Sequence, residues 1–344
     1  MSAHTVDRGA DLGGLAPLTL AKAIRAGLHR SLADDDRVVL LGEDIGTLGG
    51  VYRITDGLQA EFGRTRVVDT PLAEAGILGT AIGLAYRGFR PVVEIQFDGF
   101  IYSAFDQIVS QLARIHSRTR GAVRMPVTIR VPWAGGIGAA EHHSDSPEAY
   151  FASTPGLRVM AVSNPQDAYD GIRAAIASDD PVLFFEPKRR YHVKAEVDLD
   201  ATPTMGHARV VVPGDRVTLL AYGGLVQTAV DAAAAAREEG IGIEVIDLRS
   251  LSPVDYPVIE ASVRKTGRLV ITHEAALSGG LGAELAASIT ERCFEFLEAA
   301  PVRVTGHDVP FPPAKAERHH LPDLDRMLDG VDRALGLIAS GVRA

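Results

Sequence analysis

The residues best suited to chemistry lie between Asp69 and Gln107, where one carboxylate is surrounded by small and apolar residues. Glu74 follows a proline-containing turn, and glycines recur after it at helical spacing, at Gly76, Gly79 and Gly83. Each glycine costs a helix about 0.8–1 kcal/mol relative to alanine, so another backbone packed very close is the simplest compensation. The stretch therefore predicts a carboxylate at the entrance of a helix that is pressed against a partner. The alternative is a glutamate stabilised by the helix dipole.

A second candidate group is the pair of histidines in AEHHSDSPEAY, which follows a glycine-rich loop. Histidine titrates near neutral pH, so His142 or His143 in a loop after a strand is suited to proton transfer. Because adjacent side chains point in different directions, we expect at most one of the two to work. The alternative is a pair of loop histidines hydrogen-bonded to backbone. Asp145 is too close in sequence to complete a metal site, and Ser144 lacks the G-x-S-x-G context of a serine nucleophile.

Two glycine-rich stretches raise the question of a nucleotide site, and neither supports one. GEDIGTLGG and AGGIGAA are each followed by a polar or extended segment, whereas a dinucleotide fingerprint opens a helix. The sequence also lacks the G-x-x-x-x-G-K-[ST] phosphate-binding loop. We therefore expect no nicotinamide or nucleotide site in this chain.

Length and composition indicate a globular enzyme with two domains. The 344 residues exceed the usual size of one core, and 46% hydrophobic with 23% charged residues is ordinary for a soluble enzyme. A net charge of −9 argues against a nucleic-acid-binding surface, and no apolar run approaches the roughly 20 residues that span a bilayer. The first residues show no secretory signal, and the single cysteine, Cys293, excludes an internal disulfide. These features predict a cytoplasmic location.

Alternating strands and helices must position the candidate residues. In the first half we expect strands at 37–41, 91–95, 127–131, 159–162 and 182–186, and helices at 19–32, 55–62, 101–118, 146–152 and 165–178. Thr19 is the expected N-cap of the first of these helices. In the second half we expect strands at 217–222, 243–247, 268–273 and 302–304, and helices at 225–239, 255–265, 280–298 and from 324 onward. This alternation is typical of mostly parallel sheets covered by helices on both faces. We therefore predict an α/β fold of two doubly wound domains, at 15–190 and 207–340, joined by a linker at 191–206.

Many stretches match one family in order and spacing, from about residue 19 to 330. They are GEDIGTLGGVYRITDGL, RVVDTPLAEAGILGTAIGLAYRGFRPVVEIQFDGF, SAFDQI, EHHSDSPEA, PGLRVM, DDPVLFFEPKRRY, EVIDLRSLSP, KTGRLVITHEA and GHDVPFPPA. Together they resemble the beta subunit of the thiamine-diphosphate-dependent decarboxylase component of 2-oxo acid dehydrogenase complexes. The resemblance implies a transketolase-like pyrimidine-binding domain followed by a transketolase C-terminal-like domain.

The resemblance also implies the roles of individual residues. Glu74 matches the glutamate that bonds the pyrimidine nitrogen of thiamine diphosphate, where a partly desolvated carboxylate can share a proton with the ring. His143, rather than His142, matches the histidine that assists acyl transfer to lipoamide. The other expected cofactor contacts are Glu43, Leu72, Gln96 and Phe100. Taken alone, Phe100 would be a core aromatic and Glu43 a solvated carboxylate at a strand end.

A missing motif indicates which partners the chain needs. The family binds the diphosphate and its magnesium through a G-D-G motif, followed later by asparagine, on the alpha subunit. This sequence lacks that motif, since Gly214-Asp215 is followed by Arg216. We therefore expect an alpha subunit that carries the magnesium, an alpha2beta2 heterotetramer with the cofactor at its interfaces, and a dihydrolipoyl acyltransferase as a further partner. The glycines after Glu74 would provide a tight contact between subunits.

A few short sequence strings indicate the class of substrate. IQFDGF, SAFDQI, SPEAYF and FFEPKRRY look closer to the branched-chain 2-oxo acid enzymes than to the pyruvate enzymes of animal mitochondria. We therefore expect oxidative decarboxylation of branched-chain 2-oxo acids such as 2-oxoisovalerate. Bacterial pyruvate and acetoin dehydrogenases share many of these strings, so a pyruvate or acetoin enzyme is the alternative.

The sequence departs from the family pattern at three places. Asp98-Gly99 replaces the common Ala-Asp, and Ser103 stands where proline is frequent, which leaves the turn near Phe100 open. Ser178 replaces an acidic residue at a potassium site that some relatives carry, so we expect no potassium ion.

A hypothesis of a different class is a noncatalytic scaffold that only docks the acyltransferase core through its C-terminal domain. The joint presence of Glu74, Gln96, Phe100 and His143 argues against this hypothesis. Uptake of thiamine diphosphate in the presence of the alpha chain would distinguish the two.

Overall fold

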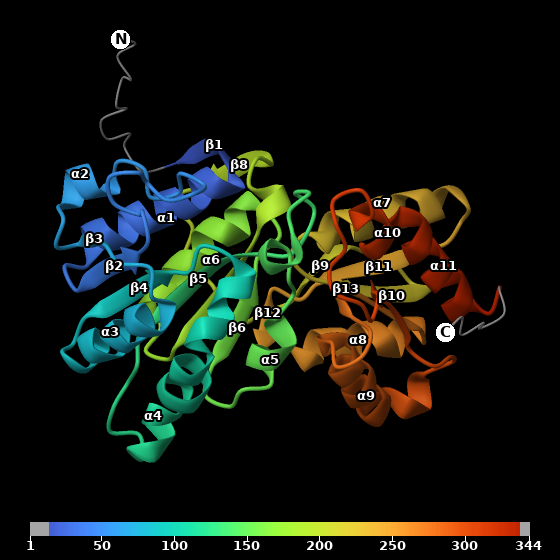
Figure 1. Cartoon of the computed structure of the whole chain (residues 1–344). Coiled ribbons are helices and arrows are strands. Elements are labelled where there is room, and N and C mark those ends of the chain that lie inside the picture. Colours follow the sequence, from blue (N-terminus) through green and yellow to red (C-terminus); the bar gives the residue numbers. More distant parts are fainter. Residues whose placement is uncertain (1–13, 338–344) are drawn as a thin grey trace, which may run out of the picture.

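The computed structural model describes residues 14–337, which form two α/β domains side by side (Figure 1). A seven-stranded sheet forms the centre of the N-terminal domain, and a five-stranded sheet forms the centre of the C-terminal domain. The predicted α/β fold with two doubly wound domains is confirmed. None of the helices in this range has both the length and the apolar character needed to cross a membrane.

The N-terminal sheet has the strand order β12-β6-β7-β5-β4-β2-β3. Its strands are β2 (Val38–Gly42), β3 (Val67–Asp69), β4 (Arg90–Glu94), β5 (Thr128–Trp133), β6 (Arg158–Ala161), β7 (Val182–Pro187) and β12 (Ser250–Ser252). All neighbours from β6 to β3 are parallel, and β12 pairs antiparallel with β6. The carboxyl ends of the parallel strands therefore meet at one edge of the sheet.

Helices cover both faces of this sheet because successive residues of a strand point to opposite sides. Val38 and Leu40 of β2 join a core cluster with α1 and α6, while Val39 and Leu41 join another cluster with α3 and α4. The helices of this domain are α1 (Leu20–Asp34), α2 (Leu58–Phe62), α3 (Glu74–Tyr86), α4 (Ala113–Arg118), α5 (Glu148–Ala152) and α6 (Pro165–Ala177). The expected N-cap is confirmed, since Thr19 accepts a hydrogen bond from the Lys22 N–H at 3.2 Å.

The C-terminal sheet has the order β14-β13-β10-β11-β9 and is parallel except for β9. Its strands are β9 (Arg209–Val212), β10 (Val217–Ala221), β11 (Ile243–Asp247), β13 (Leu269–Ala276) and β14 (Val302–Gly306). Helices α7 (Leu225–Glu238) and α11 (Leu324–Leu335) pack on one face, and α8 (Tyr256–Thr266) and α9 (Leu281–Cys293) pack on the other. Cys293 is a buried free thiol at the end of α9.

The prediction of one helix at 101–118 is wrong. The chain forms a 3₁₀ helix η1 (Asp98–Ala104), a π-helix η2 (Gln107–Leu112) and then α4. Two side chains of η1 bond to other elements, because Asp98 contacts Lys188 and Ser103 contacts Glu74. These tertiary contacts fix the backbone more strongly than helix propensity does.

Sequence patterns do not predict five of the strands, namely β1 (Leu15–Thr19), β3, β8 (Lys194–Asp198), β9 and β12. Strand β8 lies within the predicted linker at 191–206 and pairs antiparallel with β1, so this part of the segment belongs to the N-terminal domain. Apart from Val197, the residues of β8 are exposed, so the strand has no clear apolar alternation.

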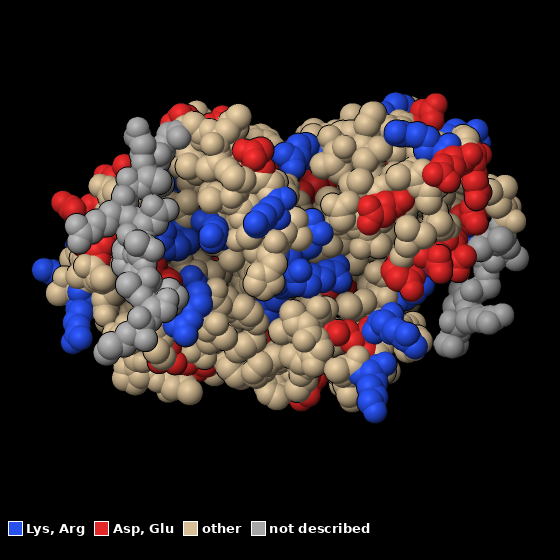
Figure 2. Space-filling view, turned by 90° about the horizontal axis from the view of Figure 1, so that it is seen from above, with Lys and Arg blue, Asp and Glu red and all other residues tan. Residues whose placement is uncertain are grey.

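Polar contacts fasten the two domains together. The Ser163 hydroxyl donates to Asp247 at 2.5 Å, and Arg249 forms an ion pair with Asp167 at 3.1 Å. The Tyr222 hydroxyl donates to Glu148 at 2.8 Å, and burial raises the pKa of that carboxyl to about 7. Figure 2 shows basic side chains gathered over the middle of one face, where the domains meet. These contacts hold the loops at the domain junction in fixed positions.

Candidate active site

The expected site residues follow the carboxyl ends of four neighbouring strands. Glu43 follows β2, Glu74 follows β3, Gln96 follows β4, and His143 follows β5. In open α/β sheets, ligands bind outside the carboxyl ends of the strands. The fold therefore brings these four residues to one edge of the N-terminal sheet, although they are far apart in sequence.

Glu74 is a buried carboxylate at the start of a helix. It is the first residue of α3 and is only 9% exposed. The Ser103 hydroxyl donates to its Oε2 at 2.9 Å, and the N-terminal end of the helix dipole favours negative charge at this position. The predicted location of Glu74 at a helix entrance is confirmed.

Glu43 is a second buried carboxylate of this site, 8% exposed, and its Oε1 has no hydrogen-bond partner among the described residues. Burial raises the pKa of the Glu43 carboxyl, and repulsion from Glu74 raises it further. The Gln96 amide donates to the Glu43 backbone carbonyl at 3.3 Å. The site therefore contains two coupled acids with different surroundings.

Aromatic rings form the wall next to these acids. The His143 ring stacks on Phe97 with centroids 3.9 Å apart, and Phe100 meets His143 edge-on at 5.2 Å. Burial and the neighbouring His142 lower the pKa of His143, so its imidazole is neutral at neutral pH. Its Nδ1 is buried and has no partner in the described chain. By contrast, the side chain of His142 is 55% exposed and lies 3.6 Å from Glu141.

The three glycines of α3 have no close neighbour in the described chain. A methyl group added at Gly79 or Gly83 would meet nothing within 4 Å, and one at Gly76 would meet only the Ala73 Cβ at 3.6 Å. No backbone within residues 14–337 provides the close packing that the sequence predicts. Leu72, just before the helix, is 79% exposed. The expected site thus borders an open surface that carries glycine and leucine.

A buried ion pair supports the aromatic wall and explains the unusual Asp98-Gly99 turn. The Lys188 ammonium donates to Asp98 Oδ2 at 2.5 Å and lies 5.8 Å from the Phe97 ring centroid. Burial raises the pKa of Asp98 to about 7 and lowers the pKa of Lys188. A Cβ at Gly99 would lie 2.5 Å from the His142 carbonyl oxygen, so only glycine fits there. The turn before Phe100 is therefore fixed by the ion pair with Lys188 and by the close approach of the His142 backbone.

Carboxylates of the C-terminal domain hold the loop that leads to His143. Glu317 of α10 (Glu317–His320) accepts hydrogen bonds from the Gly136 N–H at 2.6 Å and the Gly138 N–H at 3.0 Å. Glu274 accepts a third from the Gly135 N–H at 3.0 Å. Gly136 and Gly138 both have positive φ, which lets their N–H groups converge on one carboxylate.

Replacing Glu317 with alanine should loosen this loop without unfolding the chain. We expect the Gly136 and Gly138 amides to exchange with solvent at least about tenfold faster, because each loses a hydrogen bond to a charged group. Hydrogen-exchange mass spectrometry of peptides covering 134–143 measures the change. Glu239→Ala, at an exposed glutamate of the same domain with no side-chain bond in residues 14–337, is the control. Equal exchange in the two variants would show that Glu317 does not hold the loop.

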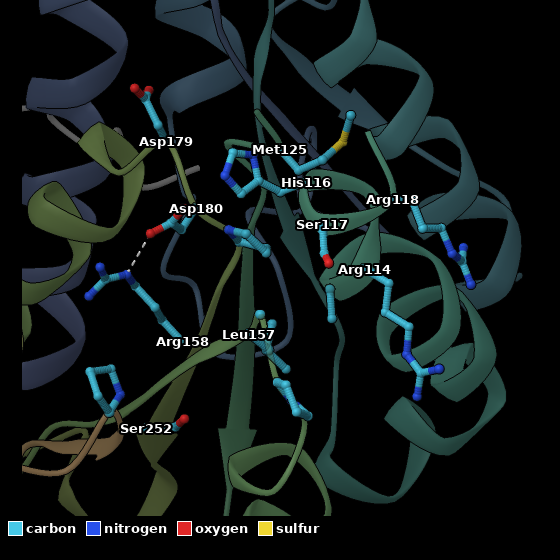
Figure 3. A pocket seen from close by; sticks show the side chains of 15 residues that line it. Arg114, His116, Ser117, Arg118, Met125, Leu157, Arg158, Asp179, Asp180 and Ser252 are labelled. Atoms are coloured by element: carbon cyan, nitrogen blue, oxygen red, sulfur yellow. Dashed lines mark hydrogen bonds and ion pairs between the residues drawn. The ribbon is translucent and has the colours of Figure 1, made fainter. Parts of the chain in front are cut away.

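A cavity of about 690 Å³ lies away from these residues (Figure 3). Arg158 and Asp180, which form an ion pair at 3.0 Å, line it together with residues of α4. Arg158 begins β6, whereas Gln96 follows the end of β4, so the cavity is at the opposite edge of the parallel sheet. It is therefore separate from the candidate active site.

Sequence patterns miss several residues that shape the site, namely Phe97, Lys188, Glu274 and Glu317, and they mark Ser103 only as an unusual residue type. These contacts join positions 29, 90 and 181 apart in sequence, and no local pattern encodes such pairings. Within residues 14–337, no group of three or more His, Cys, Asp or Glu side chains could hold a metal ion.

Comparisons with known families cover most of the chain. Residues 16–194 match the pyrimidine-binding domain of transketolase, and residues 206–327 match the C-terminal domain of transketolase. A split-gene transketolase, described as an inactive beta4 tetramer, aligns with a TM-score of 0.77 over 94% of this chain and 99% of its own. At 24% identity that likeness shows the shared fold alone.

Curated relatives are more similar. The pyruvate dehydrogenase E1 component subunit beta of Leifsonia xyli subsp. xyli is 57% identical, over 92% of this chain and 95% of that protein. The 3-methyl-2-oxobutanoate dehydrogenase subunit beta of Mycobacterium tuberculosis is 53% identical, over 92% of each chain. The 2-oxoisovalerate dehydrogenase subunit beta of Pseudomonas aeruginosa is 45% identical, over 87% of this chain and 89% of its own.

Proposed function

This chain belongs to the family of beta subunits of thiamine-diphosphate-dependent 2-oxo acid dehydrogenases, and on that premise we propose that the edge of its N-terminal sheet is the pyrimidine half of the active site. The observation that carries the proposal is the buried Glu74 beside a second acid, Glu43, with a partnerless oxygen. The proposed cofactor contacts are Glu43, Leu72, Glu74, Gln96 and Phe100, and the proposed catalytic residues are Glu74 and His143.

The residues present fit a flat ring that carries nitrogen atoms. Oε1 of Glu74 has no hydrogen-bond partner in the described chain, and neither does the buried Oε1 of Glu43, so both can receive donors from a ligand. The exposed side chain of Leu72 and the half-buried ring of Phe100 offer apolar surface close by. Bound thiamine diphosphate supplies the nucleophilic carbon and the electron sink that a 2-oxo acid needs to lose carbon dioxide.

In this proposal Glu74 activates the cofactor by sharing a proton with a nitrogen of its ring. Its burial removes competing water, and the helix start and the Ser103 hydroxyl stabilise its charge. A carboxylate in these surroundings can share a proton with a ring nitrogen at the edge of the site. Burial, and then the nearby Glu74 carboxylate, raise the pKa of Glu43 above that of an ordinary glutamate.

His143 is proposed to act at a later step, when the acyl group passes to the lipoyl sulfur. As a neutral imidazole with a lowered pKa, it carries one N–H that can donate to the sulfur and one nitrogen that can accept a proton. Its stack on Phe97 fixes the ring plane, and the loop bonds from Glu274 and Glu317 fix the backbone that carries it.

His143→Ala should separate two steps that both depend on the assembled enzyme. We expect transfer of the acyl group to lipoamide to fall about 10²-fold or more, the usual effect of losing a positioned proton-transfer group. Decarboxylation measured with an artificial electron acceptor should fall much less. His142→Ala, at the exposed neighbouring ring, is the control. Equal losses in the two assays would contradict the assignment.

The proposal includes a separate alpha subunit and an alpha2beta2 assembly. The diphosphate and magnesium half of the site is proposed to lie on that subunit. The exposed face of α3, with Gly76, Gly79 and Gly83, suits close contact with another backbone, since no side chain stands in the way. A dihydrolipoyl acyltransferase is the further proposed partner of this assembly. We place the complex in the cytoplasm.

For the substrate we propose branched-chain 2-oxo acids such as 2-oxoisovalerate, as in branched-chain amino acid degradation. Pyruvate is the second candidate, because the 57% identical relative is a pyruvate enzyme. The test mixes the purified chain with its alpha subunit, thiamine diphosphate and magnesium, and compares kcat/KM for the two acids. A higher kcat/KM for pyruvate would overturn the branched-chain assignment and leave the rest of the proposal in place.

A further inference from the structure

Ser103 makes a hydrogen bond beyond the local one that a serine usually makes to a nearby backbone carbonyl. Its hydroxyl oxygen lies 2.9 Å from Glu74 Oε2 and 2.8 Å from the backbone carbonyl oxygen of Phe100. Within residues 14–337 it is the only side chain that hydrogen-bonds the Glu74 carboxylate. The bond joins η1 to the first residue of α3, across 29 positions of sequence.

A serine hydroxyl has one hydrogen and two lone pairs, so it donates to one acceptor at a time. While Glu74 is ionised, the charge-assisted bond to the carboxylate is the stronger choice. When Oε2 carries a proton, the hydroxyl can accept that proton's bond and turn its own hydrogen to the Phe100 carbonyl. Rotation about one C–O bond therefore satisfies both protonation states of Glu74 with no movement of heavy atoms.

The neighbouring acid shows why this matters. Glu43 is also buried, but its Oε1 has no hydrogen-bond donor in the described chain. Of the two acids, Ser103 thus stabilises the charge on one only, and that one stands at the start of α3. The arrangement gives the Glu74 carboxylate, and not that of Glu43, a hydroxyl partner that can follow a shared proton.

We propose that Ser103 is a positioning residue that orients the Glu74 carboxylate and hydrogen-bonds it in both its ionised and its protonated state. The inference rests on the proposed role of Glu74 in binding the cofactor ring. It also ties Phe100 to the same event, because the hydroxyl's alternative acceptor is the carbonyl of that residue.

The alternative is that Ser103 serves only to bond the backbone carbonyl three residues before it, with no role toward Glu74. Ser153 provides that case without a carboxylate, since its hydroxyl donates to the Tyr150 carbonyl at 3.2 Å. Ser153→Ala is therefore the matched control for Ser103→Ala. Ser103→Thr keeps the hydroxyl and tests whether that group, rather than the small side chain, is what matters.

The experiment uses the assembled alpha–beta complex of each variant. Calorimetric titration with thiamine diphosphate in the presence of magnesium gives the cofactor Kd, and an artificial-acceptor assay gives kcat and the KM for the 2-oxo acid. For Ser103→Ala we expect a roughly tenfold weaker Kd and a roughly tenfold lower kcat, as for loss of one bond to a charged group, with KM changed less than about twofold. Ser103→Thr should restore both values to within about threefold.

Unchanged Kd and kcat in Ser103→Ala, an effect no larger than that of Ser153→Ala, or no rescue by threonine would each overturn the inference. Glu74→Gln in the same assays distinguishes a failure of the role of Ser103 from a failure of the proposed function. If that variant loses activity while Ser103→Ala does not, only the role of Ser103 fails. If Glu74→Gln retains cofactor binding and activity, the proposed function itself fails.

Discussion

Glu74→Gln should reduce decarboxylation by the assembled enzyme by about 10²–10⁴-fold, the usual range for loss of a positioned acid–base group. Glutamine keeps the size of the side chain and can still accept a bond from Ser103, but it cannot hold a negative charge or exchange a proton. The loss should appear in kcat with an artificial acceptor, because proton sharing precedes every later step. A reduction of less than tenfold would count against the proposed role.

Glu284→Gln is a matched control for this experiment. Glu284 stands in the first turn of α9 and accepts a bond from the Ser288 hydroxyl at 2.7 Å, as Glu74 does from Ser103 at the start of α3. It belongs to the C-terminal domain and is away from the sheet edge that carries Glu43 and Gln96. Wild-type activity in the control would show that the loss in Glu74→Gln is specific to its position.

The sequence was sufficient to predict the elements whose pattern is local. Apolar runs bounded by turns predict the central strands, because a strand covered on both faces must be apolar throughout. The helical spacing after residue 73 predicts α3, and Thr19 predicts where α1 begins. The order of these elements then places Glu43, Glu74 and Gln96 at one sheet edge, since parallel strands share a carboxyl edge.

Features that depend on tertiary contacts were not predictable from the sequence. Strand β8 is mostly exposed and exists because β1 pairs with it. The break of the expected helix at 101–118 follows from bonds of Asp98 and Ser103 to residues on other elements. The glycines of α3 predict a close backbone contact, but residues 14–337 contain none, and the proposed alpha subunit would supply it.

The site also shows why a deviation from a family pattern can be informative. In the sequence, the changes at 98, 99 and 103 stand out as departures from the pattern, but nothing local indicates which contacts they make. In the structure they supply the acid of a buried ion pair, a close approach to the His142 carbonyl, and a donor to Glu74. Each takes part in fixing η1, so the three changes act together on the wall of the site.

Lys188→Met should lower the stability of the chain by about 3–5 kcal/mol, the range expected when one partner of a buried ion pair is removed. Lys188 and Asp98 are 2% and 0% exposed, so the remaining Asp98 carboxylate would have neither water nor a counter-ion. The shift of the urea-unfolding midpoint of the purified chain, multiplied by its slope, measures the loss. Because Phe97 lies beside the ammonium and under His143, the stacked pair should loosen as well.

The stability lost in Lys188→Met should increase as pH rises. Burial already raises the pKa of Asp98 to about 7 against the opposing effect of Lys188, so removal of the lysine raises it further. An acid whose folded pKa exceeds its unfolded value of about 3.9 destabilises the fold more as pH rises. The difference between wild type and Lys188→Met should therefore be smaller at pH 5 than at pH 8. Adding Asp98→Asn removes the stranded charge, and the double variant should recover most of the stability and lose the pH dependence. A deficit that is the same at both pH values, or that the second substitution fails to relieve, would mean that packing and not charge is what Lys188 contributes.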